Sequence, residues 1–248
     1  MVHVGSFDRA ARSYEQASYW QQQVFDKLKS FLPKGPVSAL LDVGCGVAAQ
    51  LQVLEELYPE AALWGLDRSS MMLEEAKKKL FKRPISFICD DFLGIPLDVT
   101  YDLIVSNAAL HWSADILSLY QRFQLGLSDK GSFVFSLFLP ETFEELQKLC
   151  QALGKEVRIP SASFLTAEQH IGYLKQVFSD VYVQRLELRS VFNSLKDLML
   201  RIRYTGLQGE GGRPFWTPGF YKALEALYME RYGGIWAKAS VLYGVASG

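Results

Sequence analysis

Short hydrophobic runs alternate with amphipathic stretches from Val37 to Leu137. A short apolar run bounded by turn residues is typical of a buried strand, and apolar positions three or four residues apart are typical of a helix packed on one face. Their regular alternation predicts parallel strands joined by helices on both faces of one sheet. The expected strands are residues 37–41, 63–67, 85–88, 101–106 and 131–137. The expected helices are residues 51–58, 69–80 with Ser69 or Ser70 as N-cap, and 114–126 with Ser113 as N-cap.

The pattern changes in the second half of the chain. Helices are expected at residues 141–153 and after Thr166, which is a suitable cap, and the alternation of residues 181–188 indicates a more exposed strand. Residues 236–246 are expected to form the last strand. Amphipathic stretches at 195–203 and 218–232, separated by a glycine-rich loop, lie between these two strands. The pattern therefore predicts a Rossmann-like, doubly wound α/β fold with a mostly parallel seven-stranded sheet and a helical lid inserted between the last two strands.

A glycine-containing turn follows the first predicted strand, in the sequence Asp42-Val43-Gly44-Cys45-Gly46. Glycine allows a tight turn and lets a ligand approach the backbone without meeting a Cβ atom. The next helix is expected to begin near Val47, with its free N–H groups directed at the same place, which favours a carboxylate or phosphate group there. This motif is weak when taken alone, so residues further along the chain must support it.

Polar side chains follow the next three predicted strands. Asp67 ends the second strand, Asp90-Asp91-Phe92 follows the third, and Asn107 to Trp112 follows the fourth. Open α/β sheets bind ligands beyond the carboxyl ends of their strands, and Asp67 lies close to the ~20-residue offset expected for a ribose-binding acid. These residues indicate a nucleoside-containing ligand.

At this point the sequence resembles the class I S-adenosylmethionine-dependent methyltransferases over roughly residues 38–137. The resemblance implies that Asp67 binds the ribose and that Asp91, with the backbone of Phe92, contacts the adenine. Val47-Ala48 depart from the Thr-Gly usual in the family, and the methionine end of the pocket is expected to be tighter. S-adenosylmethionine is the implied cofactor and S-adenosylhomocysteine the product. The residues expected to bind the cofactor are Asp42, Gly44, Cys45, Gly46, Asp67, Arg68, Asp91, Phe92, Asn107 and Ala108.

Three further stretches resemble the malonyl-acyl-carrier-protein O-methyltransferases of biotin synthesis. They are the Ala-Arg-Ser-Tyr that ends at Tyr14, residues 106–112, and residues 198–206. The resemblance implies methylation of the free carboxylate of malonyl on acyl carrier protein. It implies one domain over residues 1–248, with an N-terminal helical lid segment (1–36), a cofactor-binding core (37–137) and a helical substrate lid (194–234). The candidate catalytic residues are Tyr14, His111, Trp112, Arg201 and Arg203.

The role of His111 is open at this point. The family more often has glutamine there, and a malonyl carboxylate, ionised at pH 7, needs no general base. Arg201 or Arg203 could orient such a carboxylate through a bidentate contact. A hydroxyl or amine acceptor would need a base, and an imidazole could supply it. His111 could also be a packed, hydrogen-bonded residue without a catalytic role.

Two other classes of protein fit parts of the sequence. A dinucleotide-dependent oxidoreductase could use Gly44, Gly46 and Asp67, but it would leave Asp91 unexplained. In addition, no tyrosine has a lysine four residues after it, which is the Tyr-x-x-x-Lys pair that short-chain reductases use for proton transfer. A non-catalytic relative that has lost the cofactor is suggested by Val47-Ala48, whereas the retained Asp42, Asp67 and Asp91 argue against it. The three histidines are scattered, so no metal site is expected.

The composition of the chain limits the partners and the cellular location that we expect for the protein. A net charge of −1 argues against a nucleic-acid-binding surface, and no apolar run is long enough for the ~20 residues that cross a membrane. The polar N-terminus does not resemble a signal peptide, and three cysteines suit reduced thiols. We therefore expect a cytoplasmic monomer without nucleic-acid or membrane partners, whose macromolecular partner is acyl carrier protein.

Overall fold

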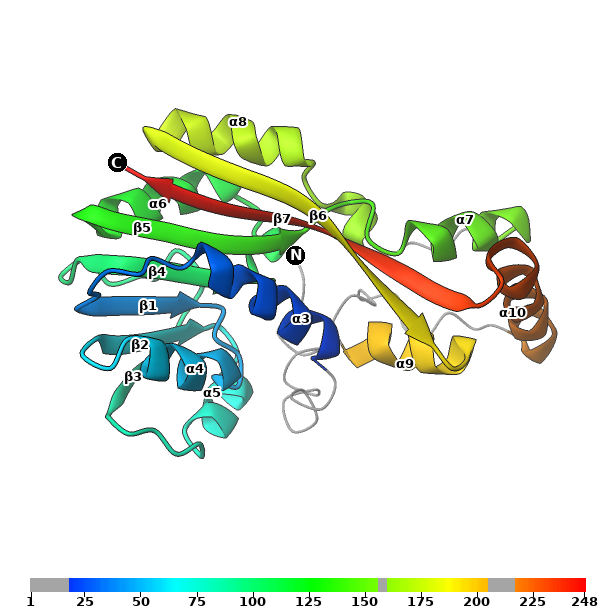
Figure 1. Cartoon of the computed structure of the whole chain (residues 1–248), viewed down its shortest axis with the longest axis horizontal. Coiled ribbons are helices and arrows are strands. Elements are labelled where there is room, and N and C mark those ends of the chain that lie inside the picture. Colours follow the sequence, from blue (N-terminus) through cyan, green and yellow to red (C-terminus); the bar gives the residue numbers. More distant parts are fainter. Residues whose placement is uncertain (1–17, 156–159, 205–216) are drawn as a thin grey trace.

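A computed structural model describes residues 18–155, 160–204 and 217–248. Its centre is a seven-stranded sheet in the order β3-β2-β1-β4-β5-β7-β6 (Figure 1). The strands from β1 to β5 are parallel, and β7 runs antiparallel to both β5 and β6. The predicted fold class is therefore confirmed. The strands are β1 (Ala39–Val43), β2 (Ala62–Asp67), β3 (Ile85–Cys89), β4 (Tyr101–Asn107), β5 (Leu127–Phe138), β6 (Asp180–Phe192) and β7 (Ile235–Ser247).

Helices cover both faces of the sheet because each face of a parallel sheet is apolar and must be buried. Two separate hydrophobic clusters result, one on each side. The first joins the sheet to α3 (Tyr19–Leu28), α4 (Ala49–Leu57) and α5 (Ser70–Ala76). The second joins it to α6 (Ile116–Gly126) and α8 (Ala167–Val177). The part of the chain that the structure describes holds no helix long and apolar enough to cross a membrane.

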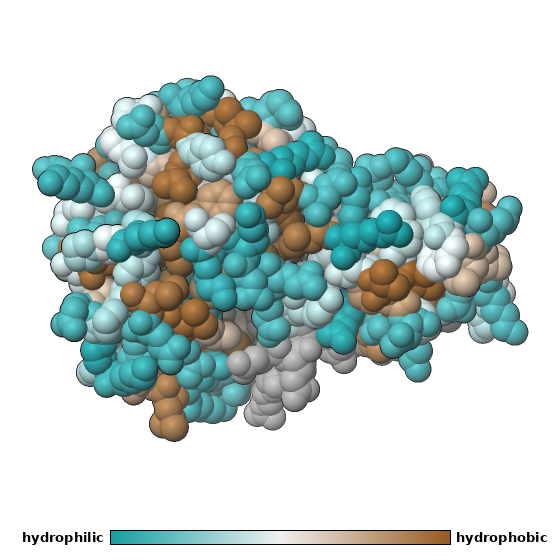
Figure 2. Space-filling model, in the orientation of Figure 1, coloured by the Kyte–Doolittle hydropathy of each residue, from teal (hydrophilic) through white to brown (hydrophobic). Residues whose placement is uncertain are grey.

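Strands β6 and β7 form a long antiparallel ribbon that runs beyond the body of the sheet (Figure 1). The chain between them forms α9 (Leu195–Tyr204) and α10 (Pro218–Tyr232), so the predicted helical insertion is present. Together with α7 (Glu144–Ala152), α10 packs on this ribbon in a projection narrower than the body (Figure 2). The role of the insertion as a lid stays a prediction.

Several predicted boundaries need correction. The helix expected at 114–126 begins at Ile116 with Asp115 as its N-cap, because Leu110–Trp112 forms a 3-10 turn that delays the helix start. The helix expected at 69–80 ends at Ala76, although its Ser69 cap is confirmed. The helix expected at 141–153 is shorter, whereas β5 and β6 are longer than predicted. The capping box at Thr166 is confirmed. Within the N-terminal segment expected to be helical over residues 1–36, α3 (Tyr19–Leu28) is present, and the part before residue 18 lies outside the described residues.

Candidate functional site

The loop between β1 and α4 folds as its glycines require. Gly44 and Gly46 have φ values of 75° and 53°, and a Cβ atom on Gly44 would lie 2.4 Å from the Cβ of Ala109. Ala48 also takes a left-handed conformation, with φ 58°, and α4 begins after it rather than near Val47. An L-residue in this conformation costs about 1–2 kcal/mol. The loop therefore keeps a glycine-like backbone at the position where the sequence departs from the family pattern.

Asp67 connects this loop to the start of α5. One carboxylate oxygen, Oδ2, accepts a hydrogen bond from the N–H of Gly46 at 2.9 Å, and the other, Oδ1, accepts one from the N–H of Ser69 at 2.9 Å. Each carboxylate oxygen can accept more than one hydrogen bond. Asp67 is thus held at the carboxyl end of β2, between the glycine loop and the start of α5.

Asp42 lies at the end of β1 and is fully buried. Its Oδ1 accepts a hydrogen bond from Nε2 of Gln50 at 3.1 Å, while Oδ2 has no partner among the described residues. Burial, with a smaller contribution from the charge of Asp67, raises the pKa of Asp42 to about 8, although the Gln50 hydrogen bond opposes the shift. A buried carboxyl group of this kind gains most from a nearby cation.

Two adjoining cavities border these residues. The Asp67 cavity, of about 60 Å³, is lined by Gly44, Gly46, Asp67, Arg68, Ser69, Met72, Phe92, Asn107, Ala108, Ala109 and Trp112. The glycine-loop cavity, of about 330 Å³, lies between the loop and α3, and it is lined by Ser18, Gln21, Gln22, Phe25, Asp26, Lys29, Gly44, Cys45, Gly46, Val47, Ala49, Gln50, Val53 and Asn107. Three residues, Gly44, Gly46 and Asn107, line both cavities. The two cavities therefore form one elongated binding region.

Most of the predicted cofactor residues line this region, but two do not. Asp91 is exposed, and its Oδ1 accepts a 3.4 Å hydrogen bond from the N–H of Leu93 within its own turn. Asp42 reaches the region only through Gln50. Sequence reasoning missed Gln21, Gln50 and Met72, which lie on helices where no motif marks them.

Asn107 holds the two sides of the region together. Its Oδ1 accepts a hydrogen bond from Oγ of Ser136 at 2.6 Å, and its Nδ2 donates to the backbone carbonyl of Gln21 at 3.0 Å. Ala108, the next residue, has a φ of 51°, which turns the chain out of β4. Asn107 thereby fixes α3 across the carboxyl ends of β4 and β5.

His111 is almost completely buried among aromatic rings. Its ring centroid lies 4.6 Å from that of Phe164, 5.0 Å from that of Trp112 and 5.3 Å from that of Phe138. The N–H of Phe138 donates to Nδ1 at 3.4 Å, which places the proton of the neutral ring on Nε2. Burial, with a smaller contribution from His170, lowers the pKa of His111 to about 3. The imidazole is therefore neutral at pH 7 and a weak base.

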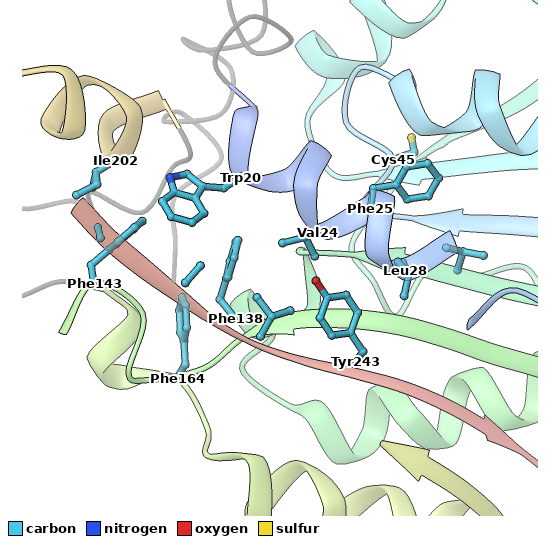
Figure 3. Packing of buried hydrophobic residues seen from close by; sticks show 14 of the residues in the cluster. Trp20, Val24, Phe25, Leu28, Cys45, Phe138, Phe143, Phe164, Ile202 and Tyr243 are labelled. Carbon is cyan, nitrogen blue, oxygen red and sulfur yellow. The ribbon is translucent and has the colours of Figure 1, made fainter. Parts of the chain in front are cut away.

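The insertion approaches this region from the side of α3. The guanidinium of Arg201 lies 5.4 Å from the ring centroid of Tyr19, and its Nε lies 3.6 Å from Oδ1 of Asp197. Figure 3 shows the indole ring of Trp20 directed toward Ile202 of α9 and Phe143, and its centroid lies 5.6 Å from that of the Phe143 ring. Arg201 is thus brought to the N-terminal end of α3. Tyr14 and the side chain of Arg203 lie outside the described residues.

Comparisons with known proteins agree with this geometry. Residues 41–135 match a family model described as a methyltransferase domain. Malonyl-[acyl-carrier protein] O-methyltransferases from Bacillus anthracis and Anoxybacillus flavithermus are 26% and 27% identical, over 92% and 91% of this chain and 88% of each relative. A Haemonchus contortus N-methyltransferase, solved in complex with phosphomonomethylethanolamine and S-adenosylhomocysteine, matches with a TM-score of 0.59 at 15% identity, covering 100% of this chain and 60% of that one.

The fold, the glycine loop and the matched domain define an S-adenosylmethionine-dependent methyltransferase of class I. Within this class the chain resembles the malonyl-acyl-carrier-protein O-methyltransferases along nearly its whole length.

The residues present fit the cofactor. Besides Oδ2 of Asp42, the buried atoms Oε1 of Gln21 and Nη2 of Arg68 have no hydrogen-bond partner among the described residues. Buried polar atoms in folded proteins are nearly always paired, so unpaired ones at a cavity indicate groups that a ligand completes. Asp67 lines the smaller cavity, where it is expected to bind the ribose, and the glycine loop leaves room for a ligand against its backbone.

Proposed function

We propose that this methyltransferase transfers the methyl group of S-adenosylmethionine to the free carboxylate of a malonyl thioester on acyl carrier protein, giving the methyl ester used in biotin synthesis. The proposal rests on the similarity to malonyl-[acyl-carrier protein] O-methyltransferases over about nine-tenths of the chain. Those relatives are named for this acceptor.

The structural observation that supports the proposal most is the burial of His111. With its pKa lowered to about 3, this imidazole is poorly suited to remove a proton from a hydroxyl or an ammonium group near pH 7. A malonyl carboxylate has already lost its proton at that pH. An acceptor that is already ionised needs no general base, so a malonyl carboxylate suits a site whose histidine is a weak base.

The reaction needs orientation more than acid–base chemistry. A carboxylate oxygen forms a bond to the methyl carbon while the carbon–sulfur bond breaks, and no proton is transferred. The sulfonium of the bound cofactor supplies the methyl group and leaves as a neutral thioether. The protein must hold the two reactants in line and exclude water. The aromatic wall of Trp112, Phe138 and Phe164 around His111 is suited to excluding water.

We propose Arg201, an arginine of the insertion, as the cation that orients the carboxylate. It lies where α9 meets α3, and its guanidinium already contacts the ring of Tyr19. Its distance of 3.6 Å from Asp197 marks a loose ion pair, and this arginine is about one-third exposed. An arginine held in this way can turn toward a second carboxylate and bind it through two parallel N–H groups.

The proposal is tested by measuring S-adenosylhomocysteine release with a panel of acceptors. Malonyl-acyl carrier protein should support turnover, whereas acetyl-acyl carrier protein, which lacks the free carboxylate, should not. Malonyl-coenzyme A separates recognition of the carrier from recognition of the acyl group. Turnover with a small hydroxyl or amine acceptor but not with the malonyl thioesters would overturn the proposal and favour another methyltransferase reaction.

A further inference from the structure

Gln21 of α3 is a buried polar residue with an incomplete set of hydrogen bonds. The residue is only 8% exposed, and its side-chain Oε1 has no partner among the described residues. It lines the glycine-loop cavity opposite Gly44, Gly46 and Gln50. A buried carbonyl oxygen without a partner destabilises the folded protein, which suggests that a ligand supplies the missing donor.

The backbone of Gln21, rather than its side chain, performs the structural role. Its carbonyl accepts the 3.0 Å hydrogen bond from Nδ2 of Asn107 that fastens α3 to the end of β4. Because this bond uses the backbone carbonyl, a substitution of similar size such as Gln21→Leu leaves its acceptor in place. The side-chain amide is therefore free for another role, and that role can be tested without dismantling the helix.

The position of the two cavities indicates which part of the cofactor meets Gln21. Asp67 places the ribose in the Asp67 cavity, and the two cavities join at Gly44, Gly46 and Asn107. The amino-acid end of the cofactor therefore extends past the glycine loop into the glycine-loop cavity. That end carries an ammonium group and a carboxylate.

The polar groups around this cavity favour the ammonium group as the partner of Gln21. Oε1 of Gln21 is a hydrogen-bond acceptor without a partner among the described residues, so the group that completes it must be a donor. The charged residues that line the cavity, Asp26 and Lys29, pair with each other at 2.8 Å and largely cancel. An ammonium group has three donors and no acceptor, which suits Oε1 of Gln21, whereas a carboxylate offers only acceptors.

We propose that Gln21 is a cofactor-binding residue whose Oε1 accepts a hydrogen bond from the α-ammonium group of S-adenosylmethionine. Gln21 thereby contributes to recognition of the amino-acid end of the cofactor. The inference concerns cofactor binding alone and does not depend on the identity of the methyl acceptor.

Calorimetry with two ligands tests the proposal. S-adenosylhomocysteine carries the amino-acid end, whereas methylthioadenosine lacks it. Gln21→Leu should weaken S-adenosylhomocysteine binding roughly tenfold or more, because hydrogen bonds to charged groups are stronger than neutral ones, and leave methylthioadenosine unchanged. Gln21→Glu, which keeps an acceptor, should bind S-adenosylhomocysteine at least as tightly as the wild type. A deaminated analogue of S-adenosylhomocysteine should bind wild type and Gln21→Leu equally.

Two control variants define the outcomes. Gln23→Leu changes another glutamine of α3 that lines neither cavity, and it should leave both affinities unchanged. Asp67→Ala should weaken both ligands because both contain the ribose. The melting temperature of each free variant reports its folding. The proposal is overturned if Gln21→Leu binds S-adenosylhomocysteine within twofold of the wild type, or if a correctly folded Gln21→Leu loses both ligands equally.

Discussion

At the scale of single residues, the surroundings of each side chain decide its chemistry. His111 could be a general base when only the sequence is considered, since an isolated imidazole titrates near pH ~6.5. Its burial among Trp112, Phe138 and Phe164 could not be predicted from the sequence, because Phe138 and Phe164 come from distant elements. The same holds for Gln21, whose burial depends on Asn107, which lies 86 residues away in the chain.

Replacing His111 by glutamine should preserve most of the methyl transfer to a malonyl thioester. A glutamine carbonyl can accept the hydrogen bond from the N–H of Phe138, and no proton has to be removed from a carboxylate. The rates of both proteins should be flat between about pH 6 and 8, since the carboxylate titrates well below this range. Stopped-time assays across that range check the expectation. A loss of about 100-fold, with a wild-type rate that follows a group titrating near pH 6.5, would indicate general-base catalysis.

At the scale of secondary-structure elements, periodicity located the elements well and their ends less well. The limits of α10 agree with the predicted 218–232 because Thr217 caps one end and Gly233, with a φ of 67°, ends the other. Such caps are visible in the sequence. The predicted start of α6 was wrong because Ser113 and Asp115 are both suitable N-caps. Only the turn at Leu110–Trp112, which precedes them, selects Asp115.

The cations of the insertion are expected to dock the acidic carrier protein. Lys196 and Lys222 are exposed on α9 and α10, where the apolar faces of the helices are buried through Leu198 and Leu224. Replacing both lysines by alanine should raise KM for malonyl-acyl carrier protein several-fold. It should also reduce the salt dependence of KM, since fewer charge contacts remain to be screened, and leave small malonyl thioesters unaffected. Arg203 and Arg213 complete the predicted cluster and lie outside the described side chains.

Steady-state kinetics at low and high salt check this expectation. Lys130→Ala is a suitable control because Lys130 is an exposed cation near the amino end of β5, whereas the insertion lies beyond the carboxyl end of that strand. Arg201→Lys should instead lower kcat on both kinds of substrate, since lysine cannot form the paired contacts of a guanidinium. If neither change affects either substrate, the insertion does not recognise the acceptor.

At the scale of the whole molecule, three buried groups should make the free energy of unfolding depend on pH. His111 and His170 act in one direction and Asp42 in the other. Burial lowers the pKa of His111 to about 3 and that of His170 to about 4, whereas the pKa of Asp42 rises to about 8. Between about pH 6 and 4.5 the unfolded chain binds two more protons at the histidines, and the folded protein binds one more at Asp42. The unfolded state therefore binds one more proton in total, and the free energy of unfolding should fall by about 1.4 kcal/mol for each pH unit of acidification.

Two variants separate these contributions. Asp42→Asn removes the opposing group, so the loss of stability on acidification should steepen to about 2.7 kcal/mol per pH unit. His170→Gln should make it shallower than in the wild type by about 1.4 kcal/mol per pH unit. Urea unfolding at several pH values in this range measures each slope. Equal slopes in all three proteins would show that these groups titrate alike in the folded and unfolded states.

The fold as a whole was predictable because hydrophobic periodicity and turn residues agree along most of the chain. The length of the β6–β7 ribbon was not predicted. Strand β6 continues through Arg189–Phe192, beyond the expected end at residue 188. In the site, the motif residues Gly44, Gly46 and Asp67 were predictable. Their partners on α3 were not, because no sequence pattern marks which face of that helix lies over the loop.

The most direct test of the account is to follow the methyl group itself. Malonyl-acyl carrier protein is incubated with the enzyme and S-adenosylmethionine carrying a deuterated methyl group, and the acyl product is fragmented in a mass spectrometer. The account predicts one labelled methyl group on the terminal carboxylate of the malonyl unit, and none when acetyl-acyl carrier protein replaces the substrate. Label on another atom of the acyl group or on the carrier protein, or no label at all under conditions where S-adenosylhomocysteine binds, would contradict it.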